Sequence, residues 1–139
     1  MGQYFLAVNC DKREFIHAHA FGDGLKFYEM CGSSDGVLAG LAHLLCQTND
    51  PPHKSTIVGS WAQNNITLVG DYDSSGLYAT AMEEYKDVSF DLIRAMCCDD
   101  SLKYSLHLKT AWRRGDDDGE LLSDQSDRDF YKEIFHGFD

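Results

Sequence analysis

The hydrophobic and polar positions of this chain follow two different periods, and each period predicts a different kind of element. Near the N-terminus, residues 4–9 are mostly aromatic or aliphatic, residues 11–13 are polar, and residues 14–18 are largely apolar again. Two such runs joined by a short polar segment are typical of a β-hairpin. We therefore predict two antiparallel strands at the N-terminus.

Four further runs predict extended structure. Residues 25–30 alternate between two faces and predict a third strand, and residues 56–59 predict a short edge segment. Residues 66–69 form an apolar run that predicts a central strand, with Ile66 and Leu68 on one face and Thr67 and Val69 on the other. Residues 102–109 alternate leucine or tyrosine with polar side chains, and their lysines suit an edge strand.

Helical spacing of hydrophobic residues appears in two places. Val37, Leu38, Leu41, Leu44 and Leu45 predict one helix, with Ser34 as its N-cap, Asp35 in its first turn and an end before residues 49–52. Residues 77–85 and 88–97 predict a second helical region, which is either one helix or two short helices with a break near Asp87. Together the elements predict a single α+β domain over residues 1–139, with a mostly antiparallel sheet of about four or five strands and two main helices on one face.

Composition restricts the class of protein. The chain has 139 residues, of which 43% are hydrophobic and 12% aromatic, which is too many for a disordered protein. Its formal net charge is −11. Direct nucleic-acid binding needs clustered lysine and arginine, so this charge argues against it. An acidic protein can instead occupy the basic groove of another protein.

The cysteines indicate a reducing compartment. Five cysteines occur, with no CxxC pair and no signal peptide before them, so we expect free thiols and a cytoplasmic protein. No apolar run approaches the roughly 20 residues that a transmembrane helix needs, so we expect no membrane partner. No phosphate-binding loop, HExxH or GxSxG motif is present, and we expect no cofactor.

The stretch that most resembles a site follows the strand at residues 66–69. Gly70 permits backbone angles that end the strand, and Asp71, Tyr72 and Asp73 follow as a cluster. The two carboxylates could act as a pair in hydrolysis or hold Mg²⁺. Aspartates are also common caps of turns and helix starts, and we favour that interpretation for Asp71 and Asp73.

His17 and His19 are the candidates for a metal site. Two histidines that are two residues apart on a strand share one face and can bind zinc if Asp71, Asp73 or Cys10 adds a third ligand. The alternative is a pair of partly exposed hairpin histidines that bind nothing. We favour this alternative, because spacing alone reveals no complete ligand set.

The C-terminal part supplies candidates for partner binding. Trp61 is expected in the core, whereas Trp112 lies beside two arginines, and tryptophan and arginine are enriched at binding hot spots. Asp116, Asp117 and Asp118 begin an acidic segment, around residues 114–129, that we expect to be mobile. This segment is either a recognition surface for a basic partner or a solvated loop.

Several segments of the first half resemble a known group of proteins. Residues 1–5 read Met-Gly-Gln-Tyr-Phe, residues 24–26 read Gly-Leu-Lys, and Gly70-Asp71-Tyr72 follows an apolar strand. This pattern resembles a family of small, largely uncharacterised bacterial and phage proteins with a Met-Gly-Gln-Tyr-Tyr-like start. The resemblance fades after Leu77, and it implies a cytosolic bacterial or phage origin without any catalytic residue.

Three functions remain open from the sequence. The leading hypothesis is a non-catalytic, acidic protein-binding module, which could inhibit a nucleic-acid-handling or defence protein by covering its basic surface. The first alternative is a small metal-assisted hydrolase that uses His17, His19, Asp71 and Asp73. The second alternative is a homodimeric structural module.

Overall fold

The computed structural model describes residues 2–31, 35–52, 55–99, 102, 103 and 106. In order, the elements are β1 (Phe5–Asn9), β2 (Glu14–Ile16), the 3₁₀ helix η1 (Ala18–Phe21), α1 (Phe27–Met30), α2 (Val37–Leu45), β3 (Ile66–Gly70), α3 (Leu77–Glu84), β4 (Lys86–Asp87) and α4 (Ser89–Met96). The acidic segment around residues 114–129 lies outside the described residues. None of the helices in the described part of the chain has the length and apolar content needed to cross a bilayer.

The four strands form one mixed sheet in the order β3-β1-β2-β4. β1 pairs antiparallel with β2 and with β3, whereas β2 and β4 run parallel. The α+β class and the N-terminal hairpin are therefore confirmed, but the prediction of a mostly antiparallel sheet is not. β4 follows β2 in the chain only after a long connection that includes α3, and parallel neighbouring strands require a long connection of this kind.

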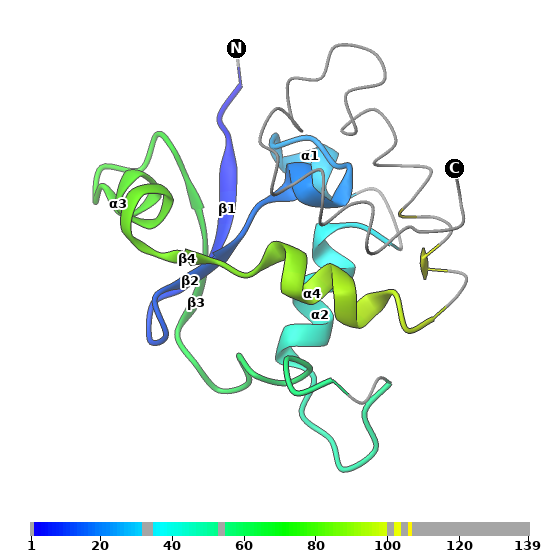
Figure 1. Ribbon diagram of the computed structural model, residues 1–139. Helices are drawn as coiled ribbons and strands as arrows, with labels where there is room; N and C mark the ends of the chain where they lie inside the picture. Colours follow the sequence, from blue (N-terminus) through cyan, green and yellow to red (C-terminus); the bar gives the residue numbers. More distant parts are fainter. Residues whose placement is uncertain (1, 32–34, 53–54, 100–101, 104–105, 107–139) are drawn as a thin grey trace.

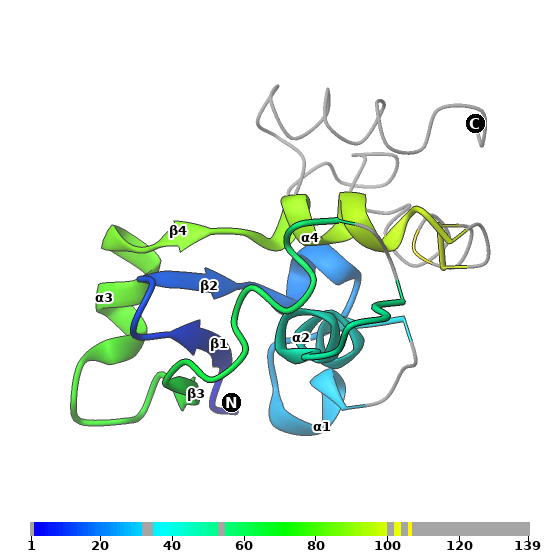
Figure 2. The same ribbon diagram turned by 90° about the horizontal axis from the view of Figure 1, so that it is seen from below.

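Helices cover both faces of the sheet (Figures 1 and 2). On one face, Ala7 and Ile16 pack into the main core with the buried side chains of Trp61, Phe21 and Leu92. On the other face, Leu6, Val8, Phe15 and Val69 pack against α3 through Ala81. The prediction that the helices lie on one face is therefore wrong. β1 directs apolar side chains to both faces of the sheet, so helices are needed on both faces to bury them.

The helix predicted from residues 37–45 is confirmed as α2, and a buried carboxylate caps its start. Gly36 is the N-cap residue and has no side chain to donate or accept. Asp23, which is only 7% exposed, accepts a 2.7 Å hydrogen bond from the backbone N–H of Val37. Ser34, the predicted cap, lies outside the described residues. The cap therefore comes from a residue distant in sequence.

The break predicted near Asp87 is also confirmed, because α3 ends at Glu84 and α4 begins at Ser89. Between them, Lys86 and Asp87 form β4. The backbone N–H groups of Lys86 and Val88 donate to the carbonyls of Arg13 and Phe15 at 3.0 Å. The segment that separates the two helices is thus an edge of the sheet, a role that the sequence did not indicate.

Three predicted strands are wrong where the structure describes them. Residues 27–30 form the short helix α1, and the N–H of Lys26 before it donates to the Glu29 carboxylate at 3.1 Å. Residues 56–59 form turns, and the N–H of Gly59 donates to His43 at 2.8 Å. The described residues of the predicted strand 102–109 are helical, namely Leu102, Lys103 and Leu106. Short apolar runs do not distinguish strand from helix.

Candidate functional site

β3 is an edge strand of the described sheet rather than the central strand that we predicted. The apolar run at residues 66–69 does form a strand, and Gly70 extends it by one residue. Along its length, β3 passes from partly exposed to buried positions, and Leu68 remains 38% exposed. This edge carries the residues that the sequence singled out as most site-like.

A groove of about 670 Å³ follows this edge. Residues 67–70 of β3 form its floor, and its walls come from the N-terminal segment and from the loop that follows the strand. These wall residues are Gln3, Phe5, Tyr72, Asp73, Ser75 and Leu77. The Gln3 side chain lies directly over Gly70, so closely that a Cβ at position 70 would collide with it. Glycine is therefore needed here to keep the end of the strand accessible to Gln3.

Asp71, Tyr72 and Asp73 have different roles at the end of this groove. The Asp71 carboxylate accepts a 2.9 Å hydrogen bond from the backbone N–H of Tyr4, and its own N–H donates to the Tyr4 carbonyl at 2.9 Å. Asp71 therefore extends the β1–β3 pairing by one residue. Tyr72 makes no such bond among the described residues, and its side chain is 66% exposed at the wall of the groove.

Asp73 stabilises the turn that leads into α3. Its carboxylate accepts hydrogen bonds from the Ser75 hydroxyl and, at 3.1 Å, from the Ser75 N–H. These bonds hold the pKa of Asp73 below its ordinary value, because they favour the charged form. The Ser75 hydroxyl in turn accepts from the N–H of Leu77 at 3.2 Å, at the start of α3. This arrangement agrees with the capping interpretation of Asp73.

A partly buried phenol, that of Tyr78, lies close to the same loop. The pKa of Tyr78 is raised, first because burial disfavours its charged form and then because of the charges of Asp71 and Tyr4. Tyr78 packs against the smaller core under α3. At neutral pH its phenol is therefore neutral, and the negative charge beside the groove comes from the aspartates.

The histidine pair occupies a different environment from the one we predicted. His17 follows β2 and is the N-cap residue of η1, and its Nδ1 accepts a 3.2 Å hydrogen bond from the N–H of His19. The two rings lie 5.0 Å apart, measured between centroids. Within the described residues, no group of three or more His, Cys, Asp or Glu side chains could hold a metal ion. His17, His19, Asp71 and Asp73 thus do not meet in one site.

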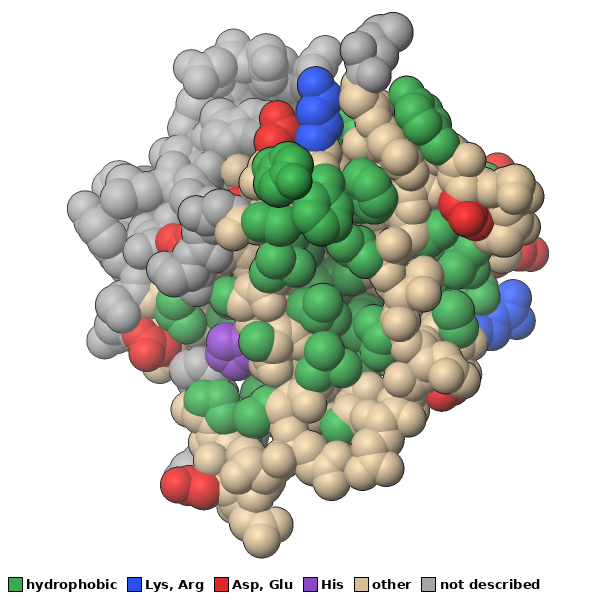
Figure 3. Space-filling model, turned by 180° about the vertical axis from the view of Figure 1, so that it is seen from behind, with side chains coloured by type: hydrophobic (Ala, Val, Ile, Leu, Met, Phe, Trp, Pro, Cys, Tyr) green, Lys and Arg blue, Asp and Glu red, His purple; other side chains and the backbone are tan. Residues whose placement is uncertain are grey.

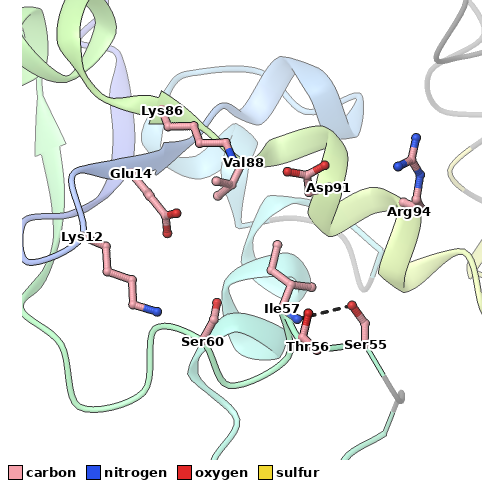
Figure 4. Close-up of a pocket in the computed structure, with 10 residues that line it drawn as sticks. All are labelled: Lys12, Glu14, Ser55, Thr56, Ile57, Ser60, Lys86, Val88, Asp91 and Arg94. Atoms are coloured by element: carbon pink, nitrogen blue, oxygen red, sulfur yellow. Dashed lines mark hydrogen bonds between the residues drawn. The ribbon is translucent and has the colours of Figure 1, made fainter.

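A second cavity, of about 400 Å³, lies beside the opposite edge of the sheet (Figure 4). Its charged lining consists of Lys12, Glu14, Lys86, Asp91 and Arg94. Figure 4 shows the Lys12 ammonium and the Glu14 carboxylate directed into the same space. Glu14 also accepts a 2.9 Å hydrogen bond from the indole N–H of the fully buried Trp61. Sequence analysis missed this cavity, because its residues come from four separate segments.

The cysteines are free thiols in different environments. All five cysteines are free, and Cys10, Cys31 and Cys98 are exposed. Burial raises the pKa of Cys97 to about 12, which leaves little thiolate at neutral pH. Because the thiolate form of cysteine is the nucleophile, this raised pKa makes Cys97 a poor nucleophile.

An apolar face adjoins the β3 groove (Figure 3). The aromatic rings of Phe5 and Phe27 meet edge to face with their centroids 5.5 Å apart. The ring centroids of Phe27 and Tyr28 are 5.4 Å apart. Phe27 is 44% exposed and Tyr28 is 85% exposed. Exposed aromatic side chains beside the open edge of a sheet are typical of a recognition surface.

Two of the predicted partner-binding candidates therefore line one groove, namely Tyr72 and Asp73, with Asp71 beside them. The other candidates, Trp112, Asp116, Asp117 and Asp118, lie outside the described residues. A comparison of the chain with family models, curated proteins and solved structures found no match. The resemblance to small bacterial and phage proteins stays a prediction, and the functional argument depends on the geometry of this chain.

Proposed function

We propose that this protein is a non-catalytic binding module that recognises another protein through the outer edge of β3. The groove along this edge combines a partly exposed apolar residue, Leu68, with the exposed phenol of Tyr72 and the charge of Asp73. This groove is the single observation that carries the proposal, because the most site-like stretch of the sequence forms part of the groove wall.

The contents of the groove favour binding over catalysis. The Asp73 carboxylate is engaged by Ser75, and Asp71 is engaged by the Tyr4 backbone. A general acid at neutral pH requires a raised pKa, whereas the pKa of Asp73 is lowered. An aromatic side chain that is rigid and exposed is instead a common anchor at protein interfaces.

The acidic character of the chain favours a partner with a basic surface. The formal net charge is −11, and the described residues that line the β3 groove include no lysine or arginine. Charge complementarity of this kind accelerates association and selects partners. Inhibition of a nucleic-acid-handling or defence protein is one form of this proposal, since such proteins have basic grooves that an acidic protein can cover.

Site-specific photo-crosslinking in the source cell tests the proposal. A photoreactive amino acid at position 72, at the groove, should give a discrete crosslinked species. The matched control places it at position 82, because Met82 is also exposed, at 45%, but lies on α3. Equal labelling from both positions, or none from position 72, would show that the β3 edge is not the recognition surface.

The metal-assisted hydrolase has no specific observation in its favour among the described residues. Elemental analysis of the purified protein addresses it directly. One tightly held zinc per chain, lost in a His17→Ala, His19→Ala variant, would favour the hydrolase over the binding module. A homodimer is tested together with the inference below.

A further inference from the structure

We infer that β3 binds its partner by strand addition, in which an extended, basic segment of another protein pairs with the outer edge of the sheet. This inference rests on the proposed function and specifies its mode and its ligand. Strand addition gives affinity through main-chain hydrogen bonds and specificity through alternate side chains.

The register shows which backbone groups are available. β1 and β3 pair Leu6 with Val69 and Val8 with Thr67. Backbone hydrogen bonds of 2.9 Å extend the ladder from the N–H of Asp71 to the carbonyl of Tyr4 and from the N–H of Cys10 to the carbonyl of Asn65. In an antiparallel ladder, hydrogen-bonded and non-bonded pairs alternate. The intervening residues of β3 are therefore the ones whose backbone groups face away from β1: Ile66, Leu68 and Gly70.

These outward groups are open within the described part of the chain. No described strand pairs with this side of β3. The Gly70 carbonyl accepts from Asp73 at 3.1 Å, and no described partner bonds to the backbone of Ile66 or Leu68. Leu68, at the middle of the edge, thus offers both an N–H and a carbonyl to an incoming strand.

The side chains around the edge indicate what the added segment carries. Leu68 and Gly70 share the face of the sheet that holds Phe5, because side chains alternate along each strand. Gly70 has no side chain, so at this end the Gln3 side chain, and not β3 itself, lies beside the Phe5–Phe27 pair. An apolar side chain on the added strand would contact Leu68 and these rings.

The carboxylates near the groove indicate which residues occupy the remaining positions of the added segment. Among the described residues that line the groove, Asp73 is the one with a charged side chain, and Asp71 follows directly after β3. Lysine or arginine at alternate positions of the added segment would lie near these carboxylates. The ligand is therefore an extended protein segment that alternates aliphatic and basic residues.

Binding of a synthetic peptide tests this inference. The probe is a fluorescent peptide of about eight residues that alternates valine and lysine, a length that covers a strand. Its affinity is measured by fluorescence anisotropy at low salt. Leu68→Pro should weaken binding by about tenfold, because it removes the outward N–H at the middle of the edge. Proline is tolerated in edge strands where the N–H faces solvent, so circular dichroism should report an intact fold.

Matched controls separate the contributions. Leu68→Ala keeps the N–H and should weaken binding less than Leu68→Pro. A probe N-methylated at alternate residues lacks the N–H groups that would donate to the outward carbonyls of β3, and it tests wild-type protein if Leu68→Pro does not fold. A probe with glutamate in place of lysine should bind more weakly than the lysine probe, because Asp71 and Asp73 repel it.

The outcomes separate the two proposals. If Leu68→Pro protein binds the probe as wild type does, and N-methylation has no effect, strand addition is wrong. The β3 binding module would still hold if Tyr72→Ala weakened binding in the same assay, and it would fail with strand addition if Tyr72→Ala had no effect. A wild-type dimer in sedimentation that Leu68→Pro dissociates would instead identify a second copy of this chain as the occupant and overturn the basic segment.

Discussion

The two edges of the sheet differ in length, direction and attachment to the core. β3 has five residues, pairs antiparallel with β1 and leaves Leu68 exposed. β4 has two residues, Lys86 and Asp87, and pairs parallel with β2. A short, charged edge is a usual protection against unwanted pairing, whereas a longer apolar edge invites it.

Polar contacts to the buried side chains of Trp61 and Ser89 anchor the β4 side of the sheet. Glu14 of β2 is hydrogen-bonded to the buried Trp61, and the buried Ser89 hydroxyl accepts from the N–H of His17 at 2.8 Å. At the β3 side, the carboxylates of Asp71 and Asp73 bond only to neighbouring exposed segments. The difference indicates that the β4 edge serves stability and the β3 edge is available for recognition.

The largest effect that would test this comparison is expected at Trp61. Trp61→Ala should lower the free energy of unfolding by about 3–5 kcal/mol, because it leaves a cavity in the main core and removes a partner of Glu14. Leu68→Ala at the opposite edge, where the side chain is partly exposed, should cost much less. Chemical denaturation measures both. Equal losses would contradict the assignment of stability to one edge.

A smaller effect is expected at Ser89. Ser89→Ala should lower the free energy of unfolding by about 1–3 kcal/mol, because it leaves the N–H of His17 without its acceptor. Ser74→Ala is the matched control at the β3 side, since Ser74 is exposed, and it should change stability by under about 0.5 kcal/mol. Thermal unfolding of both variants compares them. A Ser89→Ala variant as stable as wild type would show that this contact does not anchor the β4 side.

The smallest expected effects are opposite pH dependences at the two edges. Burial raises the pKa of Asp87, against the opposing hydrogen bonds from Ser89, so its contribution to stability is present at low pH and is lost as pH rises through the folded-state pKa. The lowered pKa of Asp73 gives the reverse: its contribution is present above its unfolded-state pKa and is lost as pH falls below that value.

Paired substitutions separate these two signs. The free energy of unfolding of Asp87→Asn, minus that of wild type, should be larger at pH 7 than at a pH below the ordinary aspartate pKa of 3.8. Asp73→Asn should be less stable than wild type at pH 7, and this difference should shrink in acid. Urea denaturation at both pH values measures the differences. The same sign for both variants would contradict the electrostatic contrast between the edges.

The sequence alone determined the elements whose signals are local. The N-terminal hairpin, the helix at residues 37–45 and the two helices that separate near Asp87 follow from spacing and polar breaks, and the structure confirms each. It also singled out Asp71, Tyr72 and Asp73, two of which line the β3 groove. These predictions succeed because a period of two or of 3.6 needs only neighbouring residues to be recognised.

Tertiary structure decided which elements meet. The sequence could not show that residues 86–87 pair with β2, that Asp23 caps α2, or that β3 is an edge. It also predicted a strand at residues 25–30, of which residues 27–30 form the helix α1. Strand order and capping across the fold depend on contacts between distant segments, and no local period encodes them. The open edge of β3, on which the proposed function depends, exists only because the chain places its later strand, β4, on the other side of the sheet.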